Sequence, residues 1–124
     1  MVQMTLSERQ KLILGLVVQE FVDSAQPIGS NKLVKKYQLN MSSATIRNEM
    51  GFLSESGYLR QPYTSAGRIP TEDAYRFFVA ELMKSTELPI SMQDTITHQF
   101  YQAGNDTTHW MRLAASVLAH QANA

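Results

Sequence analysis

The chain has 124 residues, 44% of them hydrophobic, and a formal net charge of zero, which suits one small domain with an appendage. It contains no cysteine, which excludes a disulfide framework and thiolate metal sites. No uncharged apolar stretch approaches the about 18–20 residues that span a bilayer, and the first ten residues lack the pattern of a signal peptide. We therefore expect a cytoplasmic protein without a membrane segment.

The first helix is expected to begin at Ser7, which forms a capping-box pattern with Gln10, and to extend through Val22. Proline disfavours a helical conformation in the residue before it, so the Gln26-Pro27 pair ends this helix. The broad apolar face predicted for this helix consists of Leu12, Ile13, Leu16, Val17 and Phe21.

A second helix is expected after Gly29, with Leu33, Val34 and Tyr37 facing inward. Its outward-facing residues are the lysines Lys32, Lys35 and Lys36. These positive charges suit a helix that lies across a phosphate backbone. The connector at residues 38–41 is short, so the third helix must fold back sharply, which predicts a helix-turn-helix.

The third helix is expected to follow the N-cap residue Ser42 and to stop at Gly57, a typical left-handed C′ position. Ile46, Met50 and Leu53 recur at i, i+4 and i+7 and predict one buried stripe. The polar residues left available are Ser43, Thr45, Arg47 and Asn48. An arginine can pair with guanine or phosphate and an asparagine with adenine, whereas an ordinary solvated face is the alternative.

A strand from Tyr58 and a loop punctuated by glycine and proline predict a β-hairpin. Gly67 is expected where φ is positive or where the backbone approaches another group closely. Arg68, placed at the loop tip, could reach along a phosphate backbone or into a minor groove. The other polar residues of this loop are Tyr63, Thr64 and Ser65. A plain surface turn is the alternative.

Thr71 is expected to cap a fourth helix that is apolar on more than one side. The excess predicts a second partner, either another protomer or another domain, unless the first helix covers it. One stripe of this helix comprises Tyr75, Phe78, Val79 and Leu82. Two more helices are predicted, from Ser91 to about Tyr101 and from Thr107 to about His120. The stripe of the last helix comprises Trp110, Leu113, Ala114, Val117 and Leu118.

The charges are unevenly distributed, although they sum to zero. Six basic and two acidic side chains lie between residues 28 and 70, a local formal charge of +4 that is compatible with DNA. Among the histidines at 98, 109 and 120, only His98 has a carboxylate at ligand spacing, Asp94 at i, i+4, and a metal site needs three or four ligands, so no metal or cofactor is expected. No catalytic motif is present, which argues against an enzyme.

Four segments together closely resemble the HrcA-type bacterial heat-inducible transcription repressors. They are SERQKLIL, QPIGSNKL, SSATIRNEM and ESGYLRQPYTSAGRIPTEDAYRFFV, and the similarity extends from about Leu6 to Met83. The block TSAGRIPT is far more specific than a generic helix-turn-helix pattern. The resemblance implies a winged helix that binds, as a dimer, an inverted-repeat operator in front of chaperone operons. It also implies that the chaperonin assists the active repressor and that heat shock relieves repression.

The resemblance assigns DNA-binding roles by position in this sequence. The recognition helix carries Ser42, Ser43, Thr45, Arg47 and Asn48. The wing carries Thr64, Ser65 and Arg68, and the preceding helix carries Lys32. Glu49 stands where the family commonly has aspartate. Family members continue into a larger sensing and dimer-forming region, so this chain is expected to be either an N-terminal fragment or a natural short relative.

We therefore expect a mainly α protein: a winged helix-turn-helix with a three-helix core and a small β-hairpin wing, followed by additional helices. Residues 1–86 are expected to form the DNA-binding domain, and 87–124 a helical arm that starts a linker to the sensing and dimerisation region. The expected function is sequence-specific binding of double-stranded DNA by a repressor of heat-shock genes, acting as a homodimer. The alternative is a winged-helix module that binds protein and not DNA.

Overall fold

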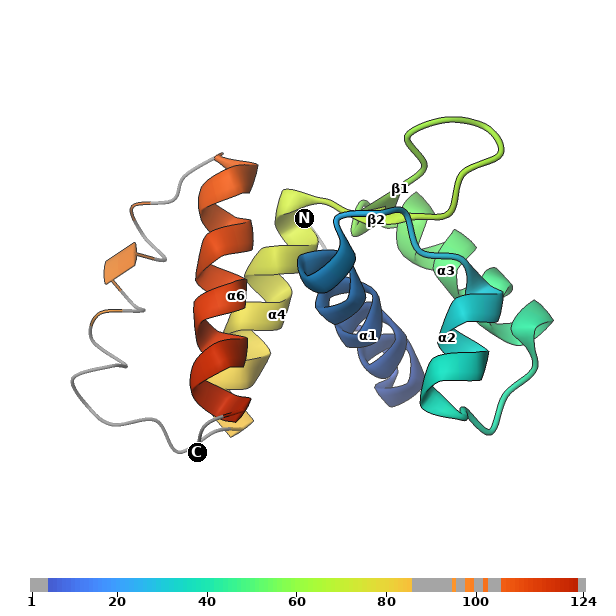
Figure 1. Cartoon of the computed structure of the whole chain (residues 1–124), viewed down its shortest axis with the longest axis horizontal. Helices are drawn as coiled ribbons and strands as arrows, with labels where there is room; N and C mark the ends of the chain where they lie inside the picture. Colours follow the sequence, from blue (N-terminus) through green and yellow to red (C-terminus); the bar gives the residue numbers. More distant parts are fainter. Residues whose placement is uncertain (1–4, 86–94, 96–97, 100–101, 103–105, 123–124) are drawn as a thin grey trace. The chain divides into compact units, whose positions relative to one another are not determined.

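The computed structural model describes residues 5–85, 95, 98–99, 102 and 106–122 (Figure 1). The chain divides into two compact units, residues 1–71 and residues 72–124. The elements of the first unit are α1 (Glu8–Ser24), α2 (Ser30–Tyr37), α3 (Ser43–Glu55), β1 (Leu59–Arg60) and β2 (Ile69–Pro70). Those of the second are α4 (Glu72–Ser85) and α6 (Thr107–Ala122). The expected fold class, a mainly α winged helix-turn-helix followed by more helices, is confirmed.

Helix α1 begins with the predicted capping box. The Ser7 hydroxyl accepts a hydrogen bond from the Gln10 N–H at 3.1 Å, and the Gln10 side chain accepts one from the Ser7 N–H at 2.9 Å. The helix ends where Ala25 adopts a left-handed conformation with φ of 56°, two residues before Pro27. The buried residues of α1 are Ile13, Leu14, Val17, Val18 and Glu20.

The predicted apolar face of α1 is partly wrong. Leu12 is 48% exposed, and Leu16 and Phe21 are only half-buried, whereas Leu14 and Val18 are fully buried. Residues 12–18 are all apolar apart from Gly15, so periodicity alone does not select one face among them. Packing selects the face instead.

Helices α2 and α3 form the predicted helix-turn-helix. Gln38, the C-cap of α2, has a left-handed conformation with φ of 49°, and the N-cap of α3, Ser42, follows four residues later. The predicted stripe of Ile46, Met50 and Leu53 is buried, with at most 3% exposure, as α3 contacts α1, α2 and β1. Gly57 has φ of 89°, which confirms the expected left-handed position after the helix.

The hairpin consists of two short antiparallel strands. Leu59 pairs with Pro70 and Arg60 with Ile69, and the inward residues Leu59 and Pro70 are buried. The Thr71 hydroxyl lies within hydrogen-bond distance of the Gly57 and Tyr58 carbonyl oxygens, at 2.7 and 3.0 Å. These bonds close the hairpin against the end of α3.

In the second unit, α4 and α6 lie side by side (Figure 1). Asp106 caps α6, because its carboxylate accepts from the N–H groups of Thr108 and His109 at 3.1 and 3.3 Å. The buried residues of the pair are Ala74, Tyr75, Phe78, Val79, Trp110, Leu113, Ala114 and Val117. Helix α6 therefore supplies a partner from within this chain for the apolar surface predicted on α4.

Some expectations for the second half fall outside the described residues. The helix predicted from 91 to about 101 lies mostly there, as does the side chain of Leu82. None of the described helices is long and apolar enough to cross a membrane. The expected functional boundary after residue 86 stays a prediction, because compactness does not establish which residues bind DNA.

Candidate nucleic-acid interface

The N-terminal turn of α3 presents a short polar surface. Ser42 caps it: its hydroxyl accepts from the Thr45 N–H at 3.1 Å and donates to the Thr45 hydroxyl at 3.0 Å. Arg47 and Asn48 follow in the next turn and are exposed, while Ser43 and Thr45 are half-buried. The capping bonds fix the start of the helix, so the side chains of its exposed face have a defined direction.

The base of the wing is attached to the segment before α2. Ile28 and Arg68 exchange both backbone hydrogen bonds, each at 2.8 Å, which adds a third strand-like segment to the hairpin. Sequence reasoning missed this pairing, because the residues around Pro27 were interpreted only as a break between helices. A Cβ at Gly67 would lie 2.5 Å from the Ile28 carbonyl carbon and oxygen. The close backbone approach expected at Gly67 is thus confirmed.

The predicted location of Arg68 at the loop tip is wrong. Its backbone pairs with Ile28 and it directly precedes β2, so it lies at the base of the wing and is half-buried. The extended tip contains Tyr63, Thr64 and Ser65, which are exposed. A glycine and an arginine in a loop indicate a turn, but they do not say which residue pairs with a distant strand.

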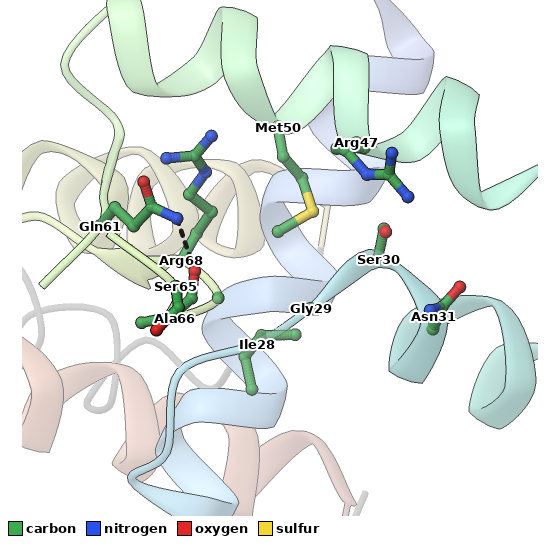
Figure 2. Close-up of a pocket in the computed structure, with 11 residues that line it drawn as sticks. Ile28, Gly29, Ser30, Asn31, Arg47, Met50, Gln61, Ser65, Ala66 and Arg68 are labelled. Carbon is green, nitrogen blue, oxygen red and sulfur yellow. Dashed lines mark hydrogen bonds between the residues drawn. The ribbon is translucent and has the colours of Figure 1, made fainter. Parts of the chain in front are cut away.

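A groove of about 330 Å³ lies between α3, the wing and the start of α2 (Figure 2). Helix α3 contributes Arg47 and Met50, and the wing contributes Arg68. Its other lining residues are Ile28, Gly29, Ser30, Asn31, Gln61, Ser65, Ala66 and Gly67. The groove therefore brings together a predicted recognition-helix arginine and a predicted wing arginine that are 21 positions apart in the sequence.

In the described part of the chain, neither Arg47 nor Arg68 forms an ion pair. Each guanidinium carries five N–H donors in a fork that matches phosphate oxygens or the edge of guanine. Two such groups in one open groove create a local positive potential, and the residues that line the groove include no carboxylate. The chemistry of this groove is therefore suited to an extended polyanion.

Lys32 occupies a different environment. Its ammonium lies 3.7 Å from the carboxylate of Glu20, and Lys36 lies 2.6 Å from the same group. The Tyr37 hydroxyl donates to Glu20 at 2.5 Å. Both lysine side chains remain about half exposed, whereas Glu20 is 2% exposed. The predicted outward positions of Lys32 and Lys36 are thus correct, but their charges are partly neutralised.

The Glu20 carboxylate is held in its charged form. Burial by itself raises its pKa, but the hydrogen bonds from Lys36 and Tyr37 and the charges of Lys36 and Lys32 lower that pKa below its ordinary value. Burial and the hydrogen bond to Glu20 raise the pKa of Tyr37. Sequence reasoning missed this cluster, because its carboxylate and its lysines lie on two different helices and the spacing within either helix does not indicate their contact.

A second ion pair also involves the candidate recognition helix. Glu49 lies 3.2 Å from the Nε of Arg9 in α1, so this α3 carboxylate turns toward α1. Among the described residues, no group of three or more histidine, cysteine, aspartate or glutamate side chains could hold a metal ion. The groups that the groove offers are the guanidinium groups of Arg47 and Arg68.

The arrangement defines a winged helix-turn-helix protein, with α2 and α3 as the helix pair and the β1–β2 hairpin as the wing. No protein-family model matches the chain. The HrcA heat-inducible transcription repressor of Roseiflexus sp. (strain RS-1) is 51% identical over 117 residues, 94% of this chain and 33% of that protein. That of Chloroflexus aurantiacus is 52% identical over 118 residues, 95% of this chain and 32% of that protein.

A solved structure is also similar to part of this chain. A crystal structure described as that of a hypothetical protein is 39% identical, with a TM-score of 0.62, over 68% of this chain and 27% of its own. The chain belongs to the HrcA heat-inducible transcription repressors, as a homologue of their N-terminal third. It spans about a third of the length of the curated relatives it matches. These relatives are named as repressors and not as enzymes.

Proposed function

We propose that this chain binds double-stranded DNA sequence-specifically, as the DNA-reading part of a repressor of heat-shock genes. The observation that carries the proposal is the groove in which Arg47 of α3 and Arg68 of the wing lie without ion-pair partners among the described residues. The names of the relatives, which are heat-inducible transcription repressors, support the biological role.

In this proposal α3 lies in the major groove, as recognition helices do. Arg47 and Asn48 contact base edges, while the short residues of the first turn let the helix approach closely; these are Ser42, Ser43 and Thr45. Arg68 contacts a phosphate at the edge of the DNA major groove. Thr64 and Ser65 of the wing lie next to the same DNA backbone. Lys32 provides a weaker phosphate contact, because it shares its charge with Glu20.

The test is DNA binding by the 124-residue chain. Duplexes selected from a random pool would be titrated by fluorescence anisotropy at several salt concentrations. We expect a log–log slope of about −4 to −5, because some four to six phosphates are neutralised and release counterions. Absence of binding at about 50 mM salt would overturn the proposal and favour a protein-interaction module.

Arginine variants test the groove itself. We expect Arg47→Ala to weaken binding by about tenfold or more, because a good base contact contributes about 1–3 kcal/mol. Arg68→Ala should weaken binding on all sequences and make the salt slope shallower by about one. The melting temperatures of both variants should match that of the parent, since neither side chain is fully buried.

The matched control is Arg112→Ala, the same substitution at an exposed position of α6 in the second unit. It should leave DNA affinity and salt slope unchanged. Arg47→Ala or Arg68→Ala variants that bind as well as this control would show that the groove is not the DNA site.

The operator and assembly form a further part of the proposal. We propose that the repressor reads an inverted repeat as a homodimer, with dimerisation supplied by the region that the longer relatives contain. We further propose that the chaperonin assists that complete repressor, as the family resemblance implies. The cytoplasm is the expected location, because a bacterial repressor acts where the chromosome lies.

A further inference from the structure

The tip of the wing exposes an aromatic ring. Tyr63 is 64% exposed, and the other large hydrophobic residue exposed in the described chain, Leu12, reaches 48%. A single exposed apolar residue is common on protein surfaces and needs no explanation by itself. Tyr63 differs from such a residue in the hydrogen bonds that hold its loop and in the groove that lies next to this loop.

The loop that carries Tyr63 is braced by its own hydrogen bonds. The Ala66 N–H donates to the Tyr63 carbonyl oxygen at 3.0 Å, and the Gln61 side-chain amide donates to the Ala66 carbonyl oxygen at 2.6 Å. At the base, Arg68 is paired with Ile28 on the segment before α2. The backbone of the tip is therefore ordered before any ligand arrives, which lowers the entropic cost of binding through it.

The same loop borders the arginine groove. Ser65 and Ala66 line that groove together with Arg47 and Arg68, and Tyr63 lies two residues before Ser65 (Figure 2). Figure 1 shows the loop between β1 and β2 extending outward from the strands. A duplex seated on the two arginines would therefore pass close to the exposed ring.

We propose that the ring of Tyr63 packs against deoxyribose groups of the DNA backbone next to the groove. The inference rests on the proposed DNA binding and adds a contact that depends on apolar surface and not on charge. Deoxyribose presents C–H groups that suit the face of a phenol ring, and tyrosine loses little side-chain entropy on binding because it has two χ angles. The hydroxyl stays in water or at the backbone edge.

The test compares Tyr63→Ala and Tyr63→Phe with the parent chain on one selected duplex over a salt series. We expect Tyr63→Ala to raise Kd by about tenfold, the effect of losing about 50 Å² of buried apolar contact. The salt slope should stay unchanged, because no phosphate contact is lost. Tyr63→Phe should remain within about twofold of the parent, since it keeps the ring.

Each alternative outcome has a distinct meaning. Parent and Tyr63→Ala chains with equal affinity would overturn this inference and leave the proposed function intact. A Tyr63→Phe variant as weak as Tyr63→Ala, or a shallower slope for Tyr63→Ala, would assign the contact to the hydroxyl and overturn the packing claim. A parent chain that binds no duplex would overturn the proposed function and the inference together. Arg68→Ala is the positive control for the salt slope, because this variant is expected to make the slope shallower.

Discussion

Glu20 is a buried carboxylate that the sequence analysis did not single out. It is the buried charged residue among those described, and it contacts Lys32, Lys36 and Tyr37 of the following helix. A buried carboxylate is costly unless its oxygens receive hydrogen bonds and opposite charge, and here α2 provides both. The cluster therefore joins α1 to α2 and fixes the helix that precedes the candidate recognition helix.

We predict that Glu20→Gln destabilises the chain by about 1–3 kcal/mol, because the lysines lose their counter-charge while the amide keeps a similar shape. Chemical denaturation at pH 7, followed by circular dichroism, measures this change. The control is Glu8→Gln on the same helix, since the Glu8 side chain is 94% exposed and pairs with Lys11 at 3.6 Å. Equal losses for the two variants would contradict the assigned role of Glu20.

The same cluster predicts a pH dependence with a definite sign. The folded-state pKa of Glu20 lies below its ordinary value of 4.5, so its stabilisation is complete above that value. It is lost as the pH falls below about 4.5 and through the folded-state pKa, where the carboxylate becomes protonated. The parent should therefore lose more stability than Glu20→Gln between pH 6 and the acid range. Parallel curves for the two proteins would contradict this sign.

At the scale of elements, the sequence predicted the buried face of a helix only where the spacing of apolar residues selects one face. In α3 only one stripe of apolar residues exists, so Ile46, Met50 and Leu53 could be assigned to the core. In α1 nearly every position from 12 to 18 is apolar, and the face was partly misassigned. Long-range backbone pairing left no such signal: nothing in the residues around Ile28 indicated that they pair with Arg68.

The candidate site shows the same division. Sequence alone selected Arg47 and Arg68 as functional residues, and the structure brings both to one groove. The sequence could not place Arg68 at the base of the wing, because that position depends on the pairing with Ile28. It also could not show that Lys32 shares a carboxylate with Lys36, since Glu20 lies in another helix.

The attachment of the wing leads to a prediction for Gly67. An alanine Cβ there would lie 2.5 Å from backbone atoms of Ile28 and 2.9 Å from the Gly29 nitrogen, so one of the two segments must move. We expect Gly67→Ala to destabilise the chain by about 1–3 kcal/mol and to weaken DNA binding, because the wing shifts relative to α3. Thermal melts and anisotropy titrations measure the two effects.

Gly51 provides the matched control for this substitution. It lies within α3, and a Cβ there would meet nothing within 4 Å. Gly51→Ala should stabilise the chain by up to about 1 kcal/mol, because alanine is the better helix former. If Gly67→Ala were as stable as the parent, the close packing of the wing against the segment before α2 would not restrict this position.

At the scale of the whole molecule, one winged helix reads too few base pairs to select a site in a genome. Each good base contact contributes about 1–3 kcal/mol, and a genome offers about 10⁶–10⁹ competing sites. Two linked copies solve this problem when their recognition helices enter successive major grooves about 34 Å apart. Linkage gives the second copy an effective concentration of roughly millimolar at its half-site.

We therefore predict that two copies of this chain, joined by a flexible linker of roughly 40 glycine and serine residues, bind an inverted repeat far more tightly than one copy. For a half-site Kd of about 10 μM the gain should be about a hundredfold, because millimolar effective concentration exceeds that Kd by this factor. The control duplex moves one half-site by about five base pairs, half a helical turn, which turns the two sites to opposite faces. The gain should shrink on that duplex, whereas single copies should bind both duplexes equally. A tandem protein that binds no more tightly than one copy would contradict the binding of an inverted repeat by two copies. A single winged helix would then have to account for the specificity.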